Sequence, residues 1–186
     1  MNQSGARVDR SAGGVTRAAV RLAMLEGVNT AKSEHRTLSF VDLAAMLSEA
    51  GRIAVADERG TLRRTGNWSP GQAFGHLAGW INFGYDGYPQ RPPLLIRAVG
   101  RLMKSRVLKG PPTRGMRMPG VRAGTFATEA LSTQEGLARL RAAVARLEAG
   151  PPATANPVFG PLSHAEWKAL HLRHGEGHLG FFWPEG

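Results

Sequence analysis

The chain has 186 residues and a mixed apolar and charged composition, which suits one globular domain with a hydrophobic core. It contains no cysteine, which excludes disulfides and thiolate metal sites and leaves histidine, aspartate and glutamate as the strong metal ligands. The formal net charge is +10, which fits a solvated basic surface or a patch for nucleic acid, and no apolar run is long enough to span a membrane.

Residues 1–36 are polar, rich in arginine and poor in acidic side chains. Val15 to Leu25 could form one short amphipathic helix, but the segment lacks the apolar centre of a secretory signal. A transit peptide also fits this composition. We expect a flexible extension over residues 1–36, a single domain over residues 37–186 and a cytoplasmic protein.

Two capped helices are expected in the first half of the domain. The first takes Ser39 as its N-cap and carries apolar residues at helical spacing until it ends near Ala56. The second takes Ser69 as its N-cap and Pro70 at its first position, with Gln72 completing a capping box. It stops at residues 86–89, which read Asp-Gly-Tyr-Pro.

A long crossover follows, and it holds a short basic helix over residues 93–109 and a loop rich in proline, glycine and arginine over residues 110–124. Two further helices open on capping boxes that begin at Ser132 and Ser163. No strand pattern is visible. The predicted fold is therefore all-α: a four-helix bundle with a long crossover, containing a short extra helix, between main helices 2 and 3.

Three of the six histidines lie within eight residues of the last helix, at His171, His174 and His178. On a helix, residues three, four and seven apart share one face, so these imidazoles form a stripe. The plain interpretation of such a stripe is a solvated polar face. The alternative is a metal site, because His174 and His178 are one turn apart and imidazole is the commonest side-chain ligand.

A third ligand must come from another helix, and His76 is the only other histidine in the middle of a predicted helix. Alone, His76 would be read as a core histidine with one hydrogen bond. Trp80 and Phe83 lie about one turn or two further along and predict an apolar pocket around it. The candidate metal ligands are thus His76, His174 and His178, with His171 as a supporting group or spare ligand.

The glycines at 175 and 177 should each cost a helix interior about 1 kcal/mol relative to alanine. Either a bound metal offsets this cost or the glycines let another helix or a ligand approach closely. Glu176 lies between the two histidines but projects nearly opposite them, so it is not assigned as a general base. Asp86 is interpreted as a turn residue.

These motifs resemble the DinB/YfiT-like superfamily, and more closely an uncharacterised domain-of-unknown-function branch of it, over about residues 36–183. The resemblance rests on Trp68-Ser-Pro-Gly-Gln72, His76-Leu-Ala78, Asp86-Gly-Tyr-Pro89, Pro157-Val-Phe-Gly-Pro-Leu162 and the histidines from His171 to His178. It implies a four-helix bundle, a divalent metal held at His76, His174 and His178, and pairing into a homodimer. Better-known relatives include thiol transferases, but Leu179-Gly-Phe-Phe182 replaces the polar Arg-Gly-Gln that many of them carry.

A three-histidine site leaves coordination positions open, as catalytic sites do. We therefore expect a metal-dependent transferase or hydrolase acting on a small molecule, with zinc or nickel as the most suitable divalent ion. The alternatives are a protein that captures a metal or small ligand without catalysis and, less favoured because no aromatic residues interleave with the basic cluster, a nucleic-acid-associated protein.

Overall fold

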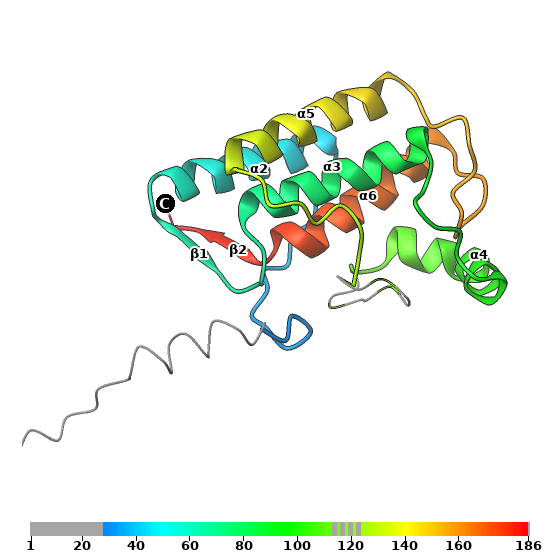
Figure 1. Cartoon of the computed structure of the whole chain (residues 1–186), viewed down its shortest axis with the longest axis horizontal. Coiled ribbons are helices and arrows are strands. Elements are labelled where there is room, and N and C mark those ends of the chain that lie inside the picture. Colours follow the sequence, from blue (N-terminus) through cyan, green and yellow to red (C-terminus); the bar gives the residue numbers. More distant parts are fainter. Residues whose placement is uncertain (1–27, 113–114, 116–117, 119–120, 122–123, 186) are drawn as a thin grey trace, which may run out of the picture.

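The computed structural model describes residues 28–112, 115, 118, 121 and 124–185. Four helices of this part of the chain form a bundle, and a fifth lies beside it (Figure 1). The all-α expectation is confirmed apart from one small pair of strands. The elements, in chain order, are α2 (Leu43–Glu58), β1 (Leu62–Arg64), α3 (Pro70–Asp86), α4 (Leu94–Lys109), α5 (Thr133–Ala149), α6 (His164–Leu179) and β2 (Phe182–Pro184).

The bundle is built from α2, α3, α5 and α6, and α3 packs most extensively against α5. Each helix turns an apolar face inward, and these faces meet in one hydrophobic core. Its largest fully buried apolar side chains come from all four helices and β2: Leu43, Met46, Ile53, Phe74, Ile81, Leu140, Leu147, Trp167, Leu179 and Phe182. The extra helix α4 lies in the crossover, as predicted, and packs against α6.

Three of the predicted helix starts are confirmed. The Ser69 hydroxyl accepts a hydrogen bond from the backbone N–H of Gln72, and Pro70 takes the first helical turn. Ser132 and Ser163 each form a complete capping box, with Glu135 and Glu166 respectively. At Ser69 the box is incomplete, because the Gln72 side chain donates instead to the carbonyl oxygen of Thr128 in the crossover.

The predicted start of the first helix is wrong by one turn. α2 begins at Leu43, and its N-cap is Asp42, whose carboxylate accepts from the N–H of Ala45. Ser39 precedes the helix, and the N–H of the neighbouring Phe40 donates to Glu176 in α6 at 2.8 Å. This long-range bond holds the chain outside the helix at the position where a local pattern predicted a cap.

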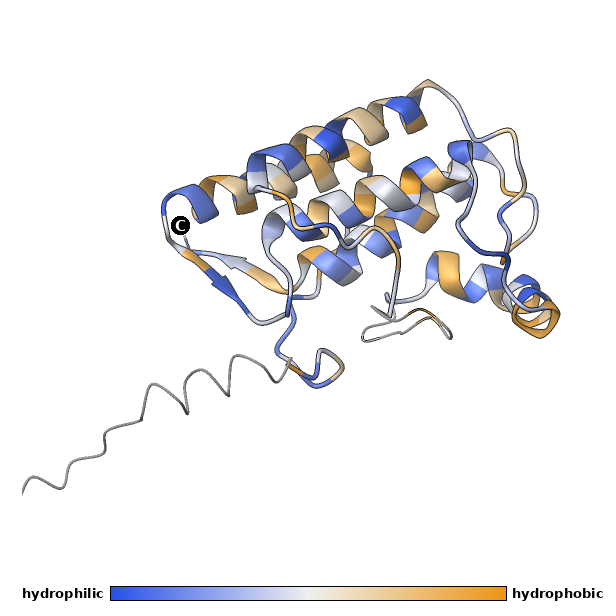
Figure 2. Cartoon of the chain, viewed as in Figure 1, coloured by the Kyte–Doolittle hydropathy of each residue, from blue (hydrophilic) through white to orange (hydrophobic). Residues whose placement is uncertain are grey.

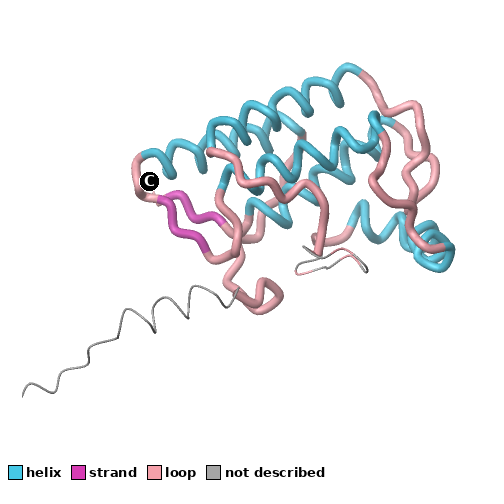
Figure 3. The backbone as a smooth tube through the Cα atoms, viewed as in Figure 1, coloured by secondary structure: helices cyan, strands magenta, loops and turns pink. Residues whose placement is uncertain are grey.

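The sequence reading also missed the two short strands, shown in magenta in Figure 3. β1 and β2 pair antiparallel, with Leu62 opposite Pro184 and Arg64 opposite Phe182. Each strand has three residues, too few to show an alternating pattern. The pairing joins the segment after α2 to the segment after α6, and so it fixes the end of α6 relative to the start of α3.

Glycines allow two helix pairs to approach closely. Where α3 meets α5, a Cβ on Gly136 would overlap the backbone oxygen of Gly71, so the two backbones are in contact. In α6, a Cβ on Gly175 would overlap the Met46 side chain of α2. Of the two explanations for the glycine at position 175, close approach of another helix is the one that the packing supports.

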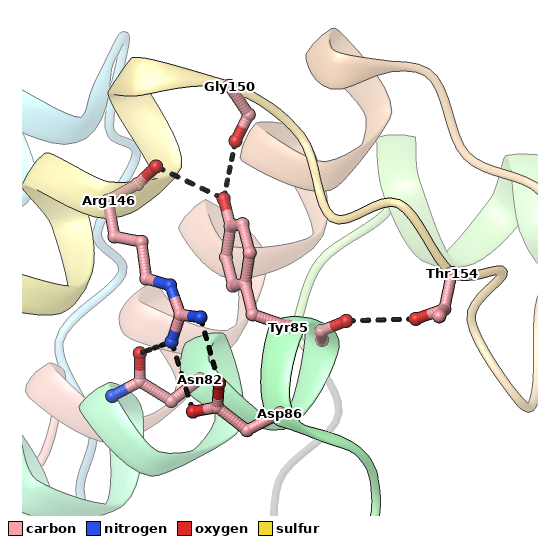
Figure 4. Close-up of polar contacts among 7 residues, drawn as sticks. Asn82, Tyr85, Asp86, Arg146, Gly150 and Thr154 are labelled. Carbon is pink, nitrogen blue, oxygen red and sulfur yellow. Dashed lines mark hydrogen bonds and ion pairs between the residues drawn. The ribbon is translucent and has the colours of Figure 1, made fainter.

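Polar contacts tie the end of α3 to the end of α5 (Figure 4). The Tyr85 hydroxyl donates toward the backbone oxygens of Arg146 and Gly150, at 3.2 and 2.5 Å. Arg146 forms a two-pronged ion pair with Asp86, at 2.8 and 3.0 Å. Asp86 is therefore an ion-pair partner at the last position of α3, which the interpretation as a turn residue did not include.

α4, which lies beside the bundle, contains several strongly apolar residues, coloured orange in Figure 2. Leu94, Leu95 and Leu102 are 76%, 74% and 87% exposed, although the helix is also basic. Within the described ranges, no helix is both long enough and apolar enough to cross a membrane.

Most of the expected N-terminal extension lies outside the described residues, including the proposed helix from Val15 to Leu25. Its last part contacts the bundle. The guanidinium of Arg36 forms an ion pair with Glu49 of α2, and the N–H of Arg36 donates to the Gly180 oxygen at 2.8 Å.

Candidate metal centre

A cavity of about 440 Å³ lies between α3, α6 and the crossover segments. One wall is the α6 face that carries Leu170, His171, His174 and His178. Residues 111, 112, 115, 118, 124–126 and 156–159 also line the cavity, and most of the lining is apolar. The predicted histidine stripe therefore faces this cavity.

His76, His174 and His178 come together at this cavity. One ring nitrogen from each lies within 4.8 Å of the others. The Nε2 atoms of His76 and His174 are 3.1 Å apart, and the three ring centroids are separated by 4.6 to 5.0 Å. We call these residues the histidine triad; they come from the middle of α3 and the last turns of α6.

A backbone carbonyl group fixes the orientation of the His76 ring. Its Nδ1 atom lies 2.9 Å from the backbone oxygen of Phe126, and a carbonyl oxygen can only accept, so Nδ1 carries the hydrogen. In the neutral ring, Nε2 then presents a lone pair toward His174. Because two lone pairs cannot face each other at 3.1 Å, His174 Nε2 carries a hydrogen that has to move before an ion can bind between them.

All three imidazoles are held in the neutral form that binds metals. Burial lowers the pKa of His76 to about 4. Burial, together with repulsion between the neighbouring imidazolium charges, lowers the pKa of His174 and of His178 well below the usual value. No proton has to be removed from a charged ring before an ion can bind at neutral pH.

The triad fits a divalent ion such as zinc. With Zn–N bonds of 2.0–2.1 Å, a tetrahedral site places its nitrogens about 3.3 Å apart, close to the spacing of the His76 and His174 nitrogens. A hydrogen bond from the second ring nitrogen to a backbone carbonyl is the usual support of a histidine ligand, and Phe126 provides it for His76. Because the described residues offer no fourth protein ligand, the three neutral nitrogens leave room for a further group.

Two tryptophans flank the triad. Trp68, just before α3, stacks on His178 with parallel rings 5.1 Å apart and also contacts His76 at 4.7 Å. Trp80 meets the His174 ring edge-on at 5.8 Å and lines the cavity. Phe83 packs behind Trp80, at 5.8 Å, and does not itself appear in the cavity wall.

His171 lines the same cavity one turn before His174, outside the triad. Its ring stacks parallel to Trp167 at 6.0 Å, and its buried Nε2 has no partner among the described residues. Burial lowers the pKa of His171 to about 4. It can therefore offer one unused ring nitrogen to whatever occupies the cavity.

Three polar side chains in or near α6 contact other parts of the chain, although the Oε2 atom of Glu176 is buried without a partner among the described residues. Glu176 is fully buried, and its Oε1 atom accepts from the Phe40 N–H and from Arg173. Glu176 is not among the residues that line the cavity. His164 contacts the Leu147 oxygen at 2.6 Å, and His35 lies 3.1 Å from the Gly177 oxygen. Among the described residues lining the cavity there is no aspartate or glutamate.

Sequence reasoning did not identify four groups at this site: Trp68, the Phe126 carbonyl, Tyr88 and Asn156. Trp68 could have been found, since it lies two turns before His76 and directly precedes a strong helix start. The other three lie in the crossover and linker segments, where no helical or strand period places a residue in space.

Residues 32–185 match the model of a family described as "Protein of unknown function (DUF1569)". No curated protein matches the chain, and no solved structure does. The matched segment contains all the described helices and the complete triad.

Proposed function

Because the chain belongs to the DUF1569 family, whose function is unknown, its chemistry has to be inferred from the site, and we propose that it binds one divalent metal ion at the histidine triad. In this proposal the protein has a DinB-like bundle and is a metal-dependent transferase or hydrolase acting on a small molecule. Zinc and nickel are the ions best suited to three imidazoles.

One observation carries the proposal: three neutral imidazoles from two helices converge at the wall of a mostly apolar cavity. A cluster of histidines with a merely structural role would be expected to satisfy its nitrogens with backbone or side-chain partners. Among the described residues, only His76 has a backbone partner, at Nδ1, and its Nε2 faces the Nε2 of His174. The cavity of about 440 Å³ has the size of a small-molecule site.

A bound ion would supply Lewis-acid chemistry and would activate a nucleophile. The chain's own residues would do the rest. Trp68 and Trp80 would hold the imidazole rings of His178 and His174 in place and exclude water from the ion. His171 would give or accept one hydrogen bond through Nε2. No carboxylate of the described cavity wall is available as a proton acceptor, which favours a reaction without a separate carboxylate base.

The test of the metal site is direct. After loading with zinc or nickel and removal of excess ion, we expect one ion per chain by elemental analysis. Bound ion should also raise the free energy of unfolding, by about 2.7 kcal/mol at a free concentration 100 times the dissociation constant. A clearly substoichiometric content after loading, or no stabilisation, would contradict the proposal.

The second candidate is capture of a metal or small ligand without catalysis, and the lack of a carboxylate in the described cavity wall supports it. Hydrolysis of 4-nitrophenyl acetate by the zinc-loaded protein separates the two. Turnover that disappears in His76→Ala supports catalysis, whereas equal rates in the two proteins support capture.

The expected homodimer and cytoplasmic location are part of the proposal, and sedimentation at micromolar concentration tests the first. Nucleic-acid binding is the remaining alternative. It requires an affinity for DNA that falls steeply with salt, since such binding depends on displaced counterions. A mobility shift that is absent at low salt would exclude it.

A further inference from the structure

Tyr88 and Asn156 meet at the cavity wall, away from the triad. The Nδ2 atom of Asn156 lies 3.2 Å from the Tyr88 hydroxyl. The Oδ1 atom of Asn156 accepts from the backbone N–H groups of Val158 and Phe159, at 2.9 and 3.0 Å. These two bonds settle the orientation of the amide, because only its oxygen can accept from N–H groups.

The fixed amide determines what the Tyr88 hydroxyl can do. Asn156 Nδ2 can only donate, so the Tyr88 oxygen accepts and its own hydrogen remains for another group. No acceptor for that hydrogen lies within hydrogen-bonding distance among the residues that the structure describes. Burial raises the pKa of Tyr88 to about 12, so the hydroxyl keeps its hydrogen throughout the neutral range.

Trp80 adds a second donor near by. Its ring lies 6.2 Å from that of Tyr88, between Tyr88 and the triad residue His174 at 5.8 Å. The indole Nε1 is buried and has no partner in the described part of the chain. An indole N–H can only donate, and leaving it unpaired in a buried site costs about 1–3 kcal/mol.

Two uncharged donors therefore lie on residues of the cavity wall, and neither has an acceptor among the described residues. Arg173 is the one cationic side chain of the described wall, and it forms an ion pair with Glu176 at 2.5 Å. Without a free countercharge among the described residues of the wall, burying an anion there would be costly, whereas a neutral oxygen would accept from these donors.

We propose that Tyr88 and Trp80 form a recognition site for a neutral carbonyl oxygen, such as that of an ester, amide or ketone, carried on an apolar ligand. This inference rests on the proposed function and extends it, since it names the class of molecule that the cavity beside the triad takes. The apolar wall would bind the body of the ligand, and the two donors would orient its oxygen.

The experiment compares three probes of similar size: acetophenone, ethylbenzene and benzoate. Their affinities for the full chain are measured by ligand-observed NMR, first without metal and then with zinc. In the metal-free protein we expect acetophenone to bind about 3- to 10-fold more tightly than ethylbenzene, the effect of one or two neutral hydrogen bonds. Benzoate should bind more weakly than acetophenone.

Tyr88→Phe removes only the hydroxyl, and it should reduce the preference for acetophenone over ethylbenzene by about 2- to 5-fold. Tyr85→Phe is the matched control. Tyr85 is the only other tyrosine, and its hydroxyl bonds to backbone oxygens outside the cavity wall, so its loss should leave the preference unchanged. Trp80→Phe provides a second variant, and the ratio of the two affinities corrects for any loss of packing.

Equal binding of acetophenone and ethylbenzene, tighter binding of benzoate, or a preference that survives both variants would overturn the inference. The outcome of this experiment can be distinguished from the outcome of the metal-binding test. If zinc fails to bind but the preference is lost in Tyr88→Phe, the proposed function fails and the carbonyl site stands. If zinc binds and no preference exists, the carbonyl site fails alone.

Discussion

The Nε2 atoms of His76 and His174 lie 3.1 Å apart, although 98 residues separate the two histidines in the chain. The contact joins the middle of α3 to the last turns of α6. His178 completes the group from one turn further along α6. The candidate metal site is thus a property of the packing between two helices and not of either helix alone.

Replacing His76 by alanine should lower zinc affinity by about 100-fold or more, because losing even a supporting group around a ligand costs 10- to 100-fold. Isothermal titration calorimetry measures this. His164→Ala is the control, since His164 lies at the start of α6 and bonds to the Leu147 oxygen. Equal zinc affinity in His76→Ala and the unmodified protein would leave the cross-helix site without support.

Acidification should destabilise the metal-free protein. The pKa of His171 is about 4 in the folded state and about 6.5 in an unfolded chain, as burial disfavours the charged ring. Between these values the unfolded state binds more protons, so the free energy of unfolding falls as the pH falls. The loss is about 1.4 kcal/mol per pH unit for each such histidine, and it is absent above about pH 6.5.

Urea unfolding at pH 6.5 and pH 5 measures this effect. Compared with the unmodified chain, His171→Phe should lose about 2 kcal/mol less stability over that range, because the phenyl ring cannot take up a proton. Identical losses in the two proteins would show that His171 is not kept neutral by burial.

Gly136→Ala should destabilise the fold by about 1–3 kcal/mol, because its Cβ would overlap the Gly71 backbone and force α3 and α5 apart. Gly51→Ala is the matched control within α2. Nothing lies within 4 Å of a Cβ at that position, so the variant should gain about 1 kcal/mol from helix propensity. Thermal unfolding of the two variants gives opposite shifts if the close contact is real.

Tyr85→Phe should lower the free energy of unfolding by about 1 kcal/mol, since it removes the hydroxyl that bonds to the last carbonyls of α5. The zinc affinity should not change, because Tyr85 lies outside the described cavity wall. A change in zinc affinity would mean that the α3–α5 contact also controls the position of His76.

Local signals in the sequence accounted for much of the fold. Ser69, Ser132 and Ser163 were correctly identified as N-caps because each cap acts within its own helix. The prediction of Ser39 as an N-cap was wrong, because the distant Glu176 accepts from the N–H of Phe40 and Asp42 caps the helix instead. The strands were missed for the same kind of reason: β1 exists only through pairing with β2, which lies more than a hundred residues away.

The candidate site likewise combines features that have a local signal in the sequence with features that depend on distant residues. The spacing of His174 and His178 indicates one helix face, and the position of His76 within a capped helix makes it the candidate partner. The Phe126 carbonyl, in contrast, accepts the hydrogen bond that orients His76, and Asn156 donates to the Tyr88 hydroxyl and so leaves its hydrogen for another group. Both supports lie in irregular segments, where the sequence gives no period from which a position in space can be worked out.

The distribution of the triad over α3 and α6 also has a consequence for how the protein is made. α6 is the last helix described, so during synthesis on the ribosome His76 emerges and folds into α3 well before the other two histidines exist. An ion that meets the growing chain finds one imidazole of the three. At the proposed site, metal loading would therefore follow the docking of α6, and a chain stalled before that helix would lack both the complete triad and one of the four bundle helices.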